Sequence, residues 1–328
     1  MTSPSSDLLA CPGQTERMSA HIEGDQTREV RLDADLDVMR TLALLRRGPG
    51  DPATRRDGGR LWRTSLMATG PVTYVLEQSS PRLVTARAWG DGAVELLENL
   101  PRVIGAEDDP SGFDPSHPVL TDAWRRFPGL RVPHTGRVLE ALVAAIIEQK
   151  VVGLDAFAAW RRLLLKFGDP SPGPAPTGMR VFPSAERWAA VPSWEWHLAG
   201  VDPRRARTAQ AAARVGPQLE RLAAARPLDR AAVYAGLRSI PGVGVWTPAE
   251  VGSRALGDAD AVPFGDFHVA KDVGSALVGR PIDDVELAEV LAPWSGHRFR
   301  VVRLVQLSPL ARTERRGPRM PRVDHRGI

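Results

Sequence analysis

SIPGVGVWTP, residues 239–248, lies between two stretches with helical periodicity. Gly242 and Gly244 allow positive φ and leave the amides of the turn uncovered, and the next helix, expected from about Val245, begins with unpaired N–H groups at the positive end of its dipole. The stretch therefore predicts a tight turn between two helices that can hold an anion such as a phosphate. A plain helical hairpin with a glycine cap is the alternative for PGVG alone.

A single aspartate follows this turn at a short distance. Asp266 lies twenty residues beyond Trp246, in VPFGDFHVAKDV, where another helix is expected to begin. Taken alone, an aspartate after a glycine at a helix start predicts an N-cap.

Most of the chain before the turn predicts helices. Apolar residues recur at helical spacing, interrupted by a connector rich in Pro and Gly at 170–183. We expect helices at 139–149, 154–167, 185–190, 194–199, 204–225 and 230–239.

The N-terminal part has a different pattern. Val30 and Leu32 alternate with charged residues, as in a half-buried strand. Three further strands, at 60–67, 72–77 and 83–89, are expected between helices at 36–46 and 93–104. This order predicts a small α+β domain at 27–112, after a disordered or misassigned start at 1–26.

Composition excludes several classes of protein. Of 328 residues, 43% are apolar and 25% charged, as in globular proteins, and no run is long enough to span a membrane. Cys11 is the only cysteine, which excludes an iron-sulfur cluster held by cysteines within the chain. The net charge of +4 is concentrated in residues 309–328, which we expect to form a basic, disordered tail. We expect a cytoplasmic, monomeric protein.

The glycine turn, the loop and Asp266 together resemble the helix-hairpin-helix DNA glycosylase superfamily. Three further stretches are similar to its bacterial 3-methyladenine DNA glycosylase II branch: FPGLRVPHTGRVLEALVAAIIEQKV (127–151) as an opening helix pair, VDPRRARTAQAAARV (201–215) as the helix before the hairpin, and LAPWSGHRFRVV (291–302) as the closing helix. The resemblance implies a mainly α fold. A two-lobed helical core at 113–308, with its hairpin at 237–250 and its catalytic loop at 258–270, follows an α+β domain of the type that forms half of the TATA-binding protein.

The resemblance also implies roles for residues of this chain. Asp266 matches the catalytic carboxylate, and Trp246 an aromatic residue of the base pocket. The hairpin positions match groups that bind a DNA phosphate and, through backbone carbonyls, a structural Na⁺ or K⁺; no other cofactor is expected. The phosphate contacts fall on Gly242, Val243, Gly244 and Thr247, and the carbonyls on Arg238, Ile240 and Val243.

Trp246 stands where relatives with lyase activity carry a lysine. No lysine lies between Lys166 and Lys271, so the hairpin has no amine to attack the sugar. We therefore expect a monofunctional glycosylase that flips a damaged, alkylated purine out of double-stranded DNA in base excision repair, in the bacterial nucleoid. The alternatives are a core role for Trp246 and a catalytically inactive protein that binds damaged DNA.

Three residues depart from the pattern of that branch. Arg303 replaces a second pocket tryptophan, and Glu250 replaces a pocket tyrosine. A cation at 303 would repel a cationic alkylated base, unless Glu250 neutralises it. The third departure is Lys150, which follows Gln149 at the wedge that fills the gap left by the flipped base; a solvated helix end is its alternative role. His268 faces away from Asp266 if both are helical, so we expect no acid-base pair.

Overall fold

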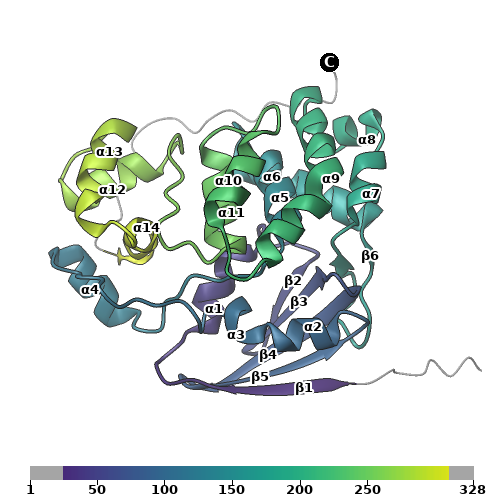
Figure 1. Ribbon diagram of the computed structural model, residues 1–328, viewed down its shortest axis with the longest axis horizontal. Helices are drawn as coiled ribbons and strands as arrows, with labels where there is room; N and C mark the ends of the chain where they lie inside the picture. The colour runs from purple at the N-terminus through teal and green to yellow at the C-terminus, as the bar shows by residue number, and fades with distance from the viewer. Residues whose placement is uncertain (1–24, 310–328) are drawn as a thin grey trace, which may run out of the picture.

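The computed structural model describes residues 25–309, and its N-terminal part is a five-stranded antiparallel sheet (Figure 1). The strand order is β1-β5-β4-β3-β2. Every second side chain of the strands points to one face of the sheet, where it packs in a core with Leu96, Leu100 and Ile104, all at most 1% exposed. The elements are β1 (Gln26–Arg31), α1 (Val38–Thr41), η1 (Leu42–Leu45), β2 (Thr54–Asp57), β3 (Arg60–Leu66), β4 (Pro71–Ser80), β5 (Leu83–Trp89), α2 (Ala93–Glu98) and α3 (Leu100–Val103).

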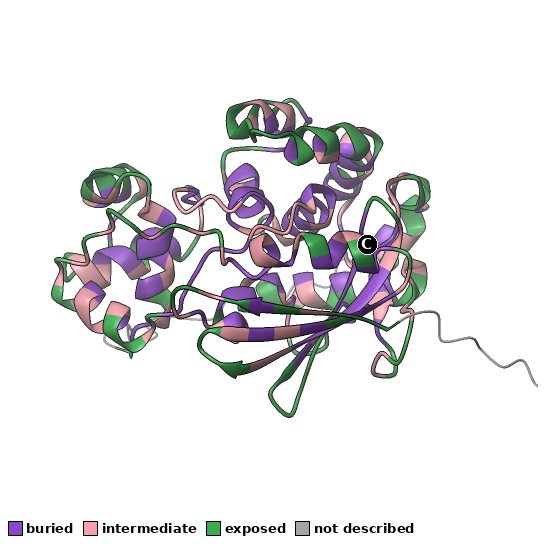
Figure 2. Ribbon diagram, turned by 60° about the horizontal axis from the view of Figure 1, so that its bottom comes forward, coloured by how far each residue is buried: buried purple, intermediate pink, exposed green. Residues whose placement is uncertain are grey.

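The first helical lobe packs around α5, whose residues from Val138 to Ile147 are almost all buried. Purple, buried segments occupy the inside of this lobe, and green, exposed segments its outside (Figure 2). Its core continues through Trp188 and Trp196, which are both fully buried. The lobe contains α5 (Val138–Glu148), α6 (Gly153–Phe167), β6 (Asp169–Pro170), β7 (Arg180–Val181), α7 (Ala185–Ala190), α8 (Ser193–Leu198), α9 (Pro203–Ala224), α10 (Arg230–Arg238) and α11 (Trp246–Ala255).

The second helical lobe has a separate core. Leu120 of one helix packs with Leu287, Leu291 and Leu304 from the end of the chain, all fully buried. Figure 1 shows α4 beside the yellow C-terminal helices. This lobe contains α4 (Pro118–Arg126), α12 (Val269–Leu277), α13 (Asp284–Leu291), η2 (Ala292–Trp294) and α14 (Arg298–Leu307).

This architecture confirms the predicted fold class, a two-lobed helical body after an antiparallel sheet. The domain limits stay predictions. The expected disordered start and basic tail lie almost wholly outside the described residues. Within residues 25–309, no helix is both long and apolar enough to cross a membrane.

Some predicted elements were wrong. Residues 127–151 do not form a helix pair, because α5 begins only at Val138 and the preceding segment, which contains Pro128 and Pro133, is irregular. The expected helix at 93–104 breaks at Asn99, and the one at 36–46 is a short α-helix followed by a 3₁₀ turn. Strand β2 was missed because it is polar and largely exposed at the sheet edge.

Candidate functional site

The hairpin between α10 and α11 is a tight turn, as predicted. The amide of Ile240 donates to the Leu237 carbonyl at 3.2 Å, and the amide of Val243 to the Ile240 carbonyl at 3.0 Å. Gly242 has a φ of +91°, and a Cβ at this position would lie 2.3 Å from Thr208 Oγ1. Both the backbone conformation and the close approach of α9 therefore require glycine here.

Gly244 lies in open space. No heavy atom of the described residues lies within 4 Å of a Cβ built at this position, and Gly244 itself is exposed. The N-cap of α11 is Val245, whose side chain offers no acceptor to the first N–H groups of the helix. The amides of Ile240 and Val243 close the turn, so an anion would meet the amides of Gly244 and of the first turn of α11.

Two polar side chains join the hairpin to the rest of the first lobe by hydrogen bonds. Gln149 Nε2 donates to the Gly242 carbonyl at 3.1 Å and to Thr247 Oγ1 at 2.9 Å. Thr208 Oγ1 lies 3.1 Å from the Pro241 carbonyl. The predicted residue Gln149 therefore reaches the predicted hairpin through its side chain.

Trp246 and Asp266 meet across the two lobes. Trp246 Nε1 donates a hydrogen bond to Asp266 Oδ2 at 3.1 Å, and both residues are half-buried. Asp266 Oδ1 accepts the amides of His268 at 2.8 Å and Val269 at 3.1 Å, at the start of α12. Asp266 therefore caps the helix with one oxygen while the other faces the predicted pocket aromatic.

The loop that carries Asp266 is held by ionic contacts at its base. Asp260 Oδ1 accepts Arg298 Nε at 2.8 Å. Burial raises the pKa of Asp260, but the hydrogen bonds and charge of Arg298 outweigh it and lower the pKa below the ordinary value. Closer to the aspartate, the Gly265 amide donates to Asp284 Oδ2 at 2.8 Å, and Phe267 is 64% exposed.

Glu250 and Arg254 form an ion pair further along α11, and both act electrostatically on Arg303 of α14. Glu250 Oε2 pairs with Arg254 Nη1 at 2.8 Å, so its carboxylate is paired within its own helix. Arg303 Nη1 donates to Gln306 Oε1 at 2.7 Å, while its Nε is buried without a partner among the described residues. Burial and the positive charge of Arg254 lower the pKa of Arg303 to about 10, against the raising effect of Glu250, so Arg303 stays charged at neutral pH.

Lys150 is exposed and has a φ of +53°, in the left-handed region that residues other than glycine seldom adopt. It directly follows Gln149, so it lies next to the hairpin anchor. Left-handed backbone at such a residue is more frequent at functional sites than elsewhere. Its wedge role and its helix-end role both stay predictions.

The structure adds residues that the sequence reasoning missed. Arg254 was findable, because it lies four residues after Glu250 on a helix. Asp272, in the first turn of α12, has its pKa raised by burial and by the charge of Asp266, an effect that His268 opposes. The burial of these two charged side chains could not be predicted, because a sequence does not reveal which charged residues pack together in the folded protein.

The expected cation site has a donor set that fits a monovalent ion. Neutral carbonyls from Arg238, Ile240 and Val243 are hard oxygen ligands without net charge. The Ile240 carbonyl already accepts one amide, and its second lone pair stays available. In the part of the chain that the structure describes, no group of three His, Cys, Asp or Glu side chains could hold a metal ion.

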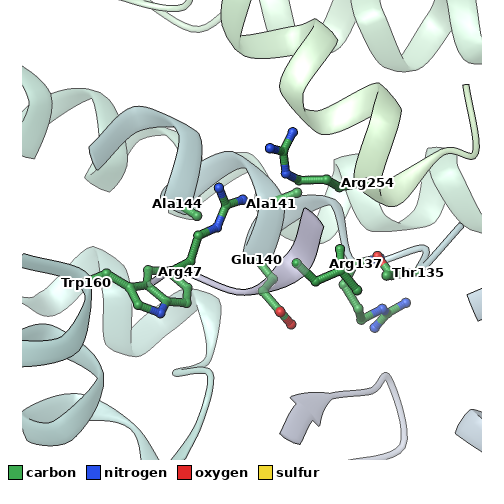
Figure 3. Close-up of a pocket in the computed structure, with 9 residues that line it drawn as sticks. Arg47, Thr135, Arg137, Glu140, Ala141, Ala144, Trp160 and Arg254 are labelled. Carbon is green, nitrogen blue, oxygen red and sulfur yellow. The ribbon is translucent and has the colours of Figure 1, made fainter. Parts of the chain in front are cut away.

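Trp246 and Asp266 line neither of two hollows among the described residues. The smaller, of about 20 Å³, lies between Glu140, Trp160 and Arg254 and has room for about one water molecule (Figure 3). The larger, of about 330 Å³, lies between the sheet and α9.

Comparison with known proteins agrees with this geometry. No family model matches the chain. It is similar to the 3-methyladenine DNA glycosylase of Archaeoglobus fulgidus, with 18% identity over 85% of this chain and 97% of that chain and a TM-score of 0.71. The fold is that of the helix-hairpin-helix DNA glycosylases. It is shared by an 8-oxoguanine glycosylase/lyase of Clostridium acetobutylicum, with 13% identity, 86% and 97% coverage and a TM-score of 0.64.

A curated relative is similar in sequence. It is a probable bifunctional transcriptional activator and DNA repair enzyme AlkA of Mycobacterium tuberculosis, 32% identical over 183 residues, which are 53% of this chain. The match spans about a third, 35%, of that relative's length. The fold of the predicted superfamily is therefore confirmed, while the activity of this glycosylase-fold chain needs its own argument.

Proposed function

We propose that the protein is a monofunctional DNA N-glycosylase that removes alkylated, 3-methyladenine-like purines during base excision repair. The observation that carries the proposal is the contact of Trp246 Nε1 with Asp266 Oδ2, next to the uncovered amides of the hairpin. It brings together an aromatic face, a carboxylate and an anion site. These are the three groups that extraction and hydrolysis of a DNA base require.

The hairpin binds the backbone of the duplex. The amides of Gly242 and Gly244 and the first turn of α11 at Thr247 hold one phosphate, while Val243, whose own amide closes the turn, shapes the site. The carbonyls of Arg238, Ile240 and Val243 would hold a monovalent cation that neutralises the carbonyl ends. Phosphate contacts set position and carry no sequence information. The protein therefore binds any duplex and searches it for a damaged base.

Base binding requires a movement of Trp246. In the free protein its indole N–H occupies Asp266 Oδ2. A base entering the site replaces this contact, so the indole turns to stack on the base, and the carboxylate oxygen becomes free. Lys150, which is exposed beside the hairpin anchor, fills the gap in the duplex with its methylene chain.

Asp266 then acts on the sugar. As the N-glycosidic bond breaks, positive charge develops at C1′, and a carboxylate held nearby stabilises it. The amides of His268 and Val269 fix Oδ1, which leaves Oδ2 to orient the attacking water and accept its proton. The water oxygen bonds to C1′, and the products are the free base and an abasic site.

The product keeps an intact strand. The hairpin presents Trp246 where a lyase requires an amine, and an indole cannot form a Schiff base. This monomeric enzyme would act on chromosomal DNA in the cytoplasm.

Alkali treatment of methylated duplex DNA tests the proposal. Wild-type protein should give alkali-sensitive abasic sites, and Asp266→Asn should give none above background while binding the duplex equally well. If wild-type protein binds damaged duplex but forms no abasic sites, it is an inactive binding protein. Breaks without alkali would contradict the monofunctional assignment.

A further inference from the structure

Phe267 directly follows Asp266 in the chain and faces solvent, with 64% of its surface exposed. The two side chains diverge, because Asp266 caps α12 with one oxygen and accepts the indole N–H of Trp246 with the other. Consecutive Cα atoms lie about 3.8 Å apart. A molecule that brings its reacting atom to the Asp266 carboxylate therefore also comes within reach of the Phe267 ring.

Two neighbours hold this ring in place. Lys271 Nζ lies 3.9 Å from the centroid of the Phe267 ring, where the electron-rich face attracts a cation. The imidazole of His268 meets the ring edge to face, with centroids 5.0 Å apart and planes at 87°. The ring is thus oriented before any ligand arrives, so binding costs it little conformational freedom.

Lys271 adds a positive charge to the exposed ring. The residue is itself exposed, and within residues 25–309 no carboxylate forms an ion pair with its ammonium group. An aromatic face beside an unpaired cation matches the two parts of a nucleotide, a flat base and a phosphate. An apolar protein partner would bury the same cation without a counter-charge, at a cost in free energy. The pair of side chains therefore favours nucleic acid.

We propose that Phe267 and Lys271 bind damaged DNA as a pair. The ring stacks on the base next to the damaged nucleotide, on the face that the flipped nucleotide leaves exposed, and Lys271 binds a phosphate of the same strand. This inference rests on the proposed glycosylase function, which places the sugar of the damaged nucleotide at Asp266. Successive nucleotides of a strand are about 3.4 Å apart along the duplex, so a ring one residue from Asp266 reaches the neighbouring nucleotide.

The pair gives the second lobe its own contact with DNA. The hairpin of the first lobe binds the backbone, and the Asp266 loop of the second lobe binds the duplex at the gap. Every base has a π face, so stacking on Phe267 carries no preference for sequence. It does require an exposed base face, which a continuous duplex does not offer. Phe267 therefore distinguishes a duplex with a gap in its stack from a continuous one.

Affinities for two duplexes test the inference without any base hydrolysis. One duplex contains a tetrahydrofuran abasic analogue, which leaves the face of the neighbouring base exposed, and the other is continuous. Phe267→Ala should weaken binding of the analogue duplex by about 10-fold and of the continuous duplex by less than about 2-fold, from loss of one stacked base. Lys271→Gln should weaken binding of both duplexes, and should reduce the slope of log affinity against log salt concentration by about one.

Matched variants separate stacking from a change in structure. Phe267→Tyr keeps the ring and should keep the affinity for the analogue duplex, whereas Phe267→Leu keeps an apolar side chain without a π face and should not. Val285→Ala, in α13 of the same lobe, truncates a side chain that is 71% exposed and should change neither affinity.

The failure of this inference and the failure of the proposed function have different signs. Equal binding of the analogue duplex by wild-type protein and Phe267→Ala would overturn the inference, whatever the rate of base release. A Phe267→Leu variant with wild-type affinity would overturn the stacking equally. Absence of abasic sites after incubation of wild-type protein with methylated duplex would instead overturn the proposed function, because the affinities are measured without hydrolysis.

Discussion

The hairpin and the Asp266 loop belong to different lobes and meet at one hydrogen bond, but they are held very differently. The hairpin is fixed by two side chains of the same lobe, Gln149 directly after α5 and Thr208 of α9. Near the aspartate, the Asp266 loop is held by the His268 amide, by Asp284 of α13 and by the indole of Trp246, and its tip exposes Gly265 and Phe267. The hairpin proposed to bind DNA is thus anchored by side chains of its own lobe, whereas the loop proposed to perform the chemistry has an exposed tip.

The two regions each contain a glycine with nearly the same φ, which allows a matched test. Gly242 has a φ of +91° and Gly265 of +87°, but only Gly242 is crowded by a neighbour, Thr208. Gly242→Ala should lower the free energy of unfolding by about 2–5 kcal/mol, from left-handed strain plus overpacking. Gly265→Ala should cost only about 1–2 kcal/mol, from strain alone. Urea denaturation measures both, and equal costs would contradict the difference in rigidity.

The stability of the protein should depend on pH through a histidine near the starts of α10 and the Asp266 loop. His134 packs against Gly257, at the start of the loop, and near Arg230, at the start of α10. Burial and the charge of Arg230 lower the pKa of His134 to about 4. The unfolded chain therefore binds more protons between about pH 6.5 and 4, so acidification through this range should remove roughly 2–3 kcal/mol of stability.

Denaturation at several pH values, with His134→Leu as the comparison, checks this expectation. The variant should show a flatter pH dependence between pH 6.5 and 4, because it removes the group whose protonation differs between the two states. An equally steep dependence in the variant would assign the effect to other groups.

Substitution of Gly244, the uncrowded glycine of the hairpin, should weaken DNA binding and leave the free energy of unfolding unchanged. Gly244→Ala meets no neighbour in the described structure, so the unfolding free energy should stay within about 0.5 kcal/mol. A methyl group over the amides should hinder approach of the phosphate and weaken duplex binding by about 10-fold, the value of one hydrogen bond. Fluorescence anisotropy with an undamaged duplex measures the affinity. An unchanged affinity would contradict phosphate binding by the hairpin.

The smallest expected effect distinguishes the two roles of Asp266. Asp266→Ala should cost about 1 kcal/mol of stability, because it removes the cap of α12, whereas Asp266→Asn should cost almost nothing, since Asn caps as well as Asp. Thermal denaturation of both variants measures the difference. Similar stability for the two would show that the cap contributes little.

The same contrast explains what could be predicted from the sequence. The hairpin was predictable because glycine and proline impose local backbone geometry, and α11 begins where expected. The loop position of Asp266 was predictable as a cap, and its contact with Trp246 agrees with the resemblance. The pairing of Glu250 with Arg254 follows helical i, i+4 spacing, but the burial of Arg303 Nε depends on how the helices pack, which local periodicity does not encode. The helix pair predicted at 127–151 was wrong because prolines override apolar spacing.

The central claim is that the carboxylate of Asp266 hydrolyses the glycosidic bond, and one rate comparison tests it most directly. Single-turnover formation of abasic sites in methylated duplex DNA should be at least about 100-fold slower for Asp266→Asn than for wild-type protein, with equal thermal stability and equal duplex affinity. An Asp266→Asn variant that is stable, binds the duplex and forms abasic sites at the wild-type rate would contradict the claim.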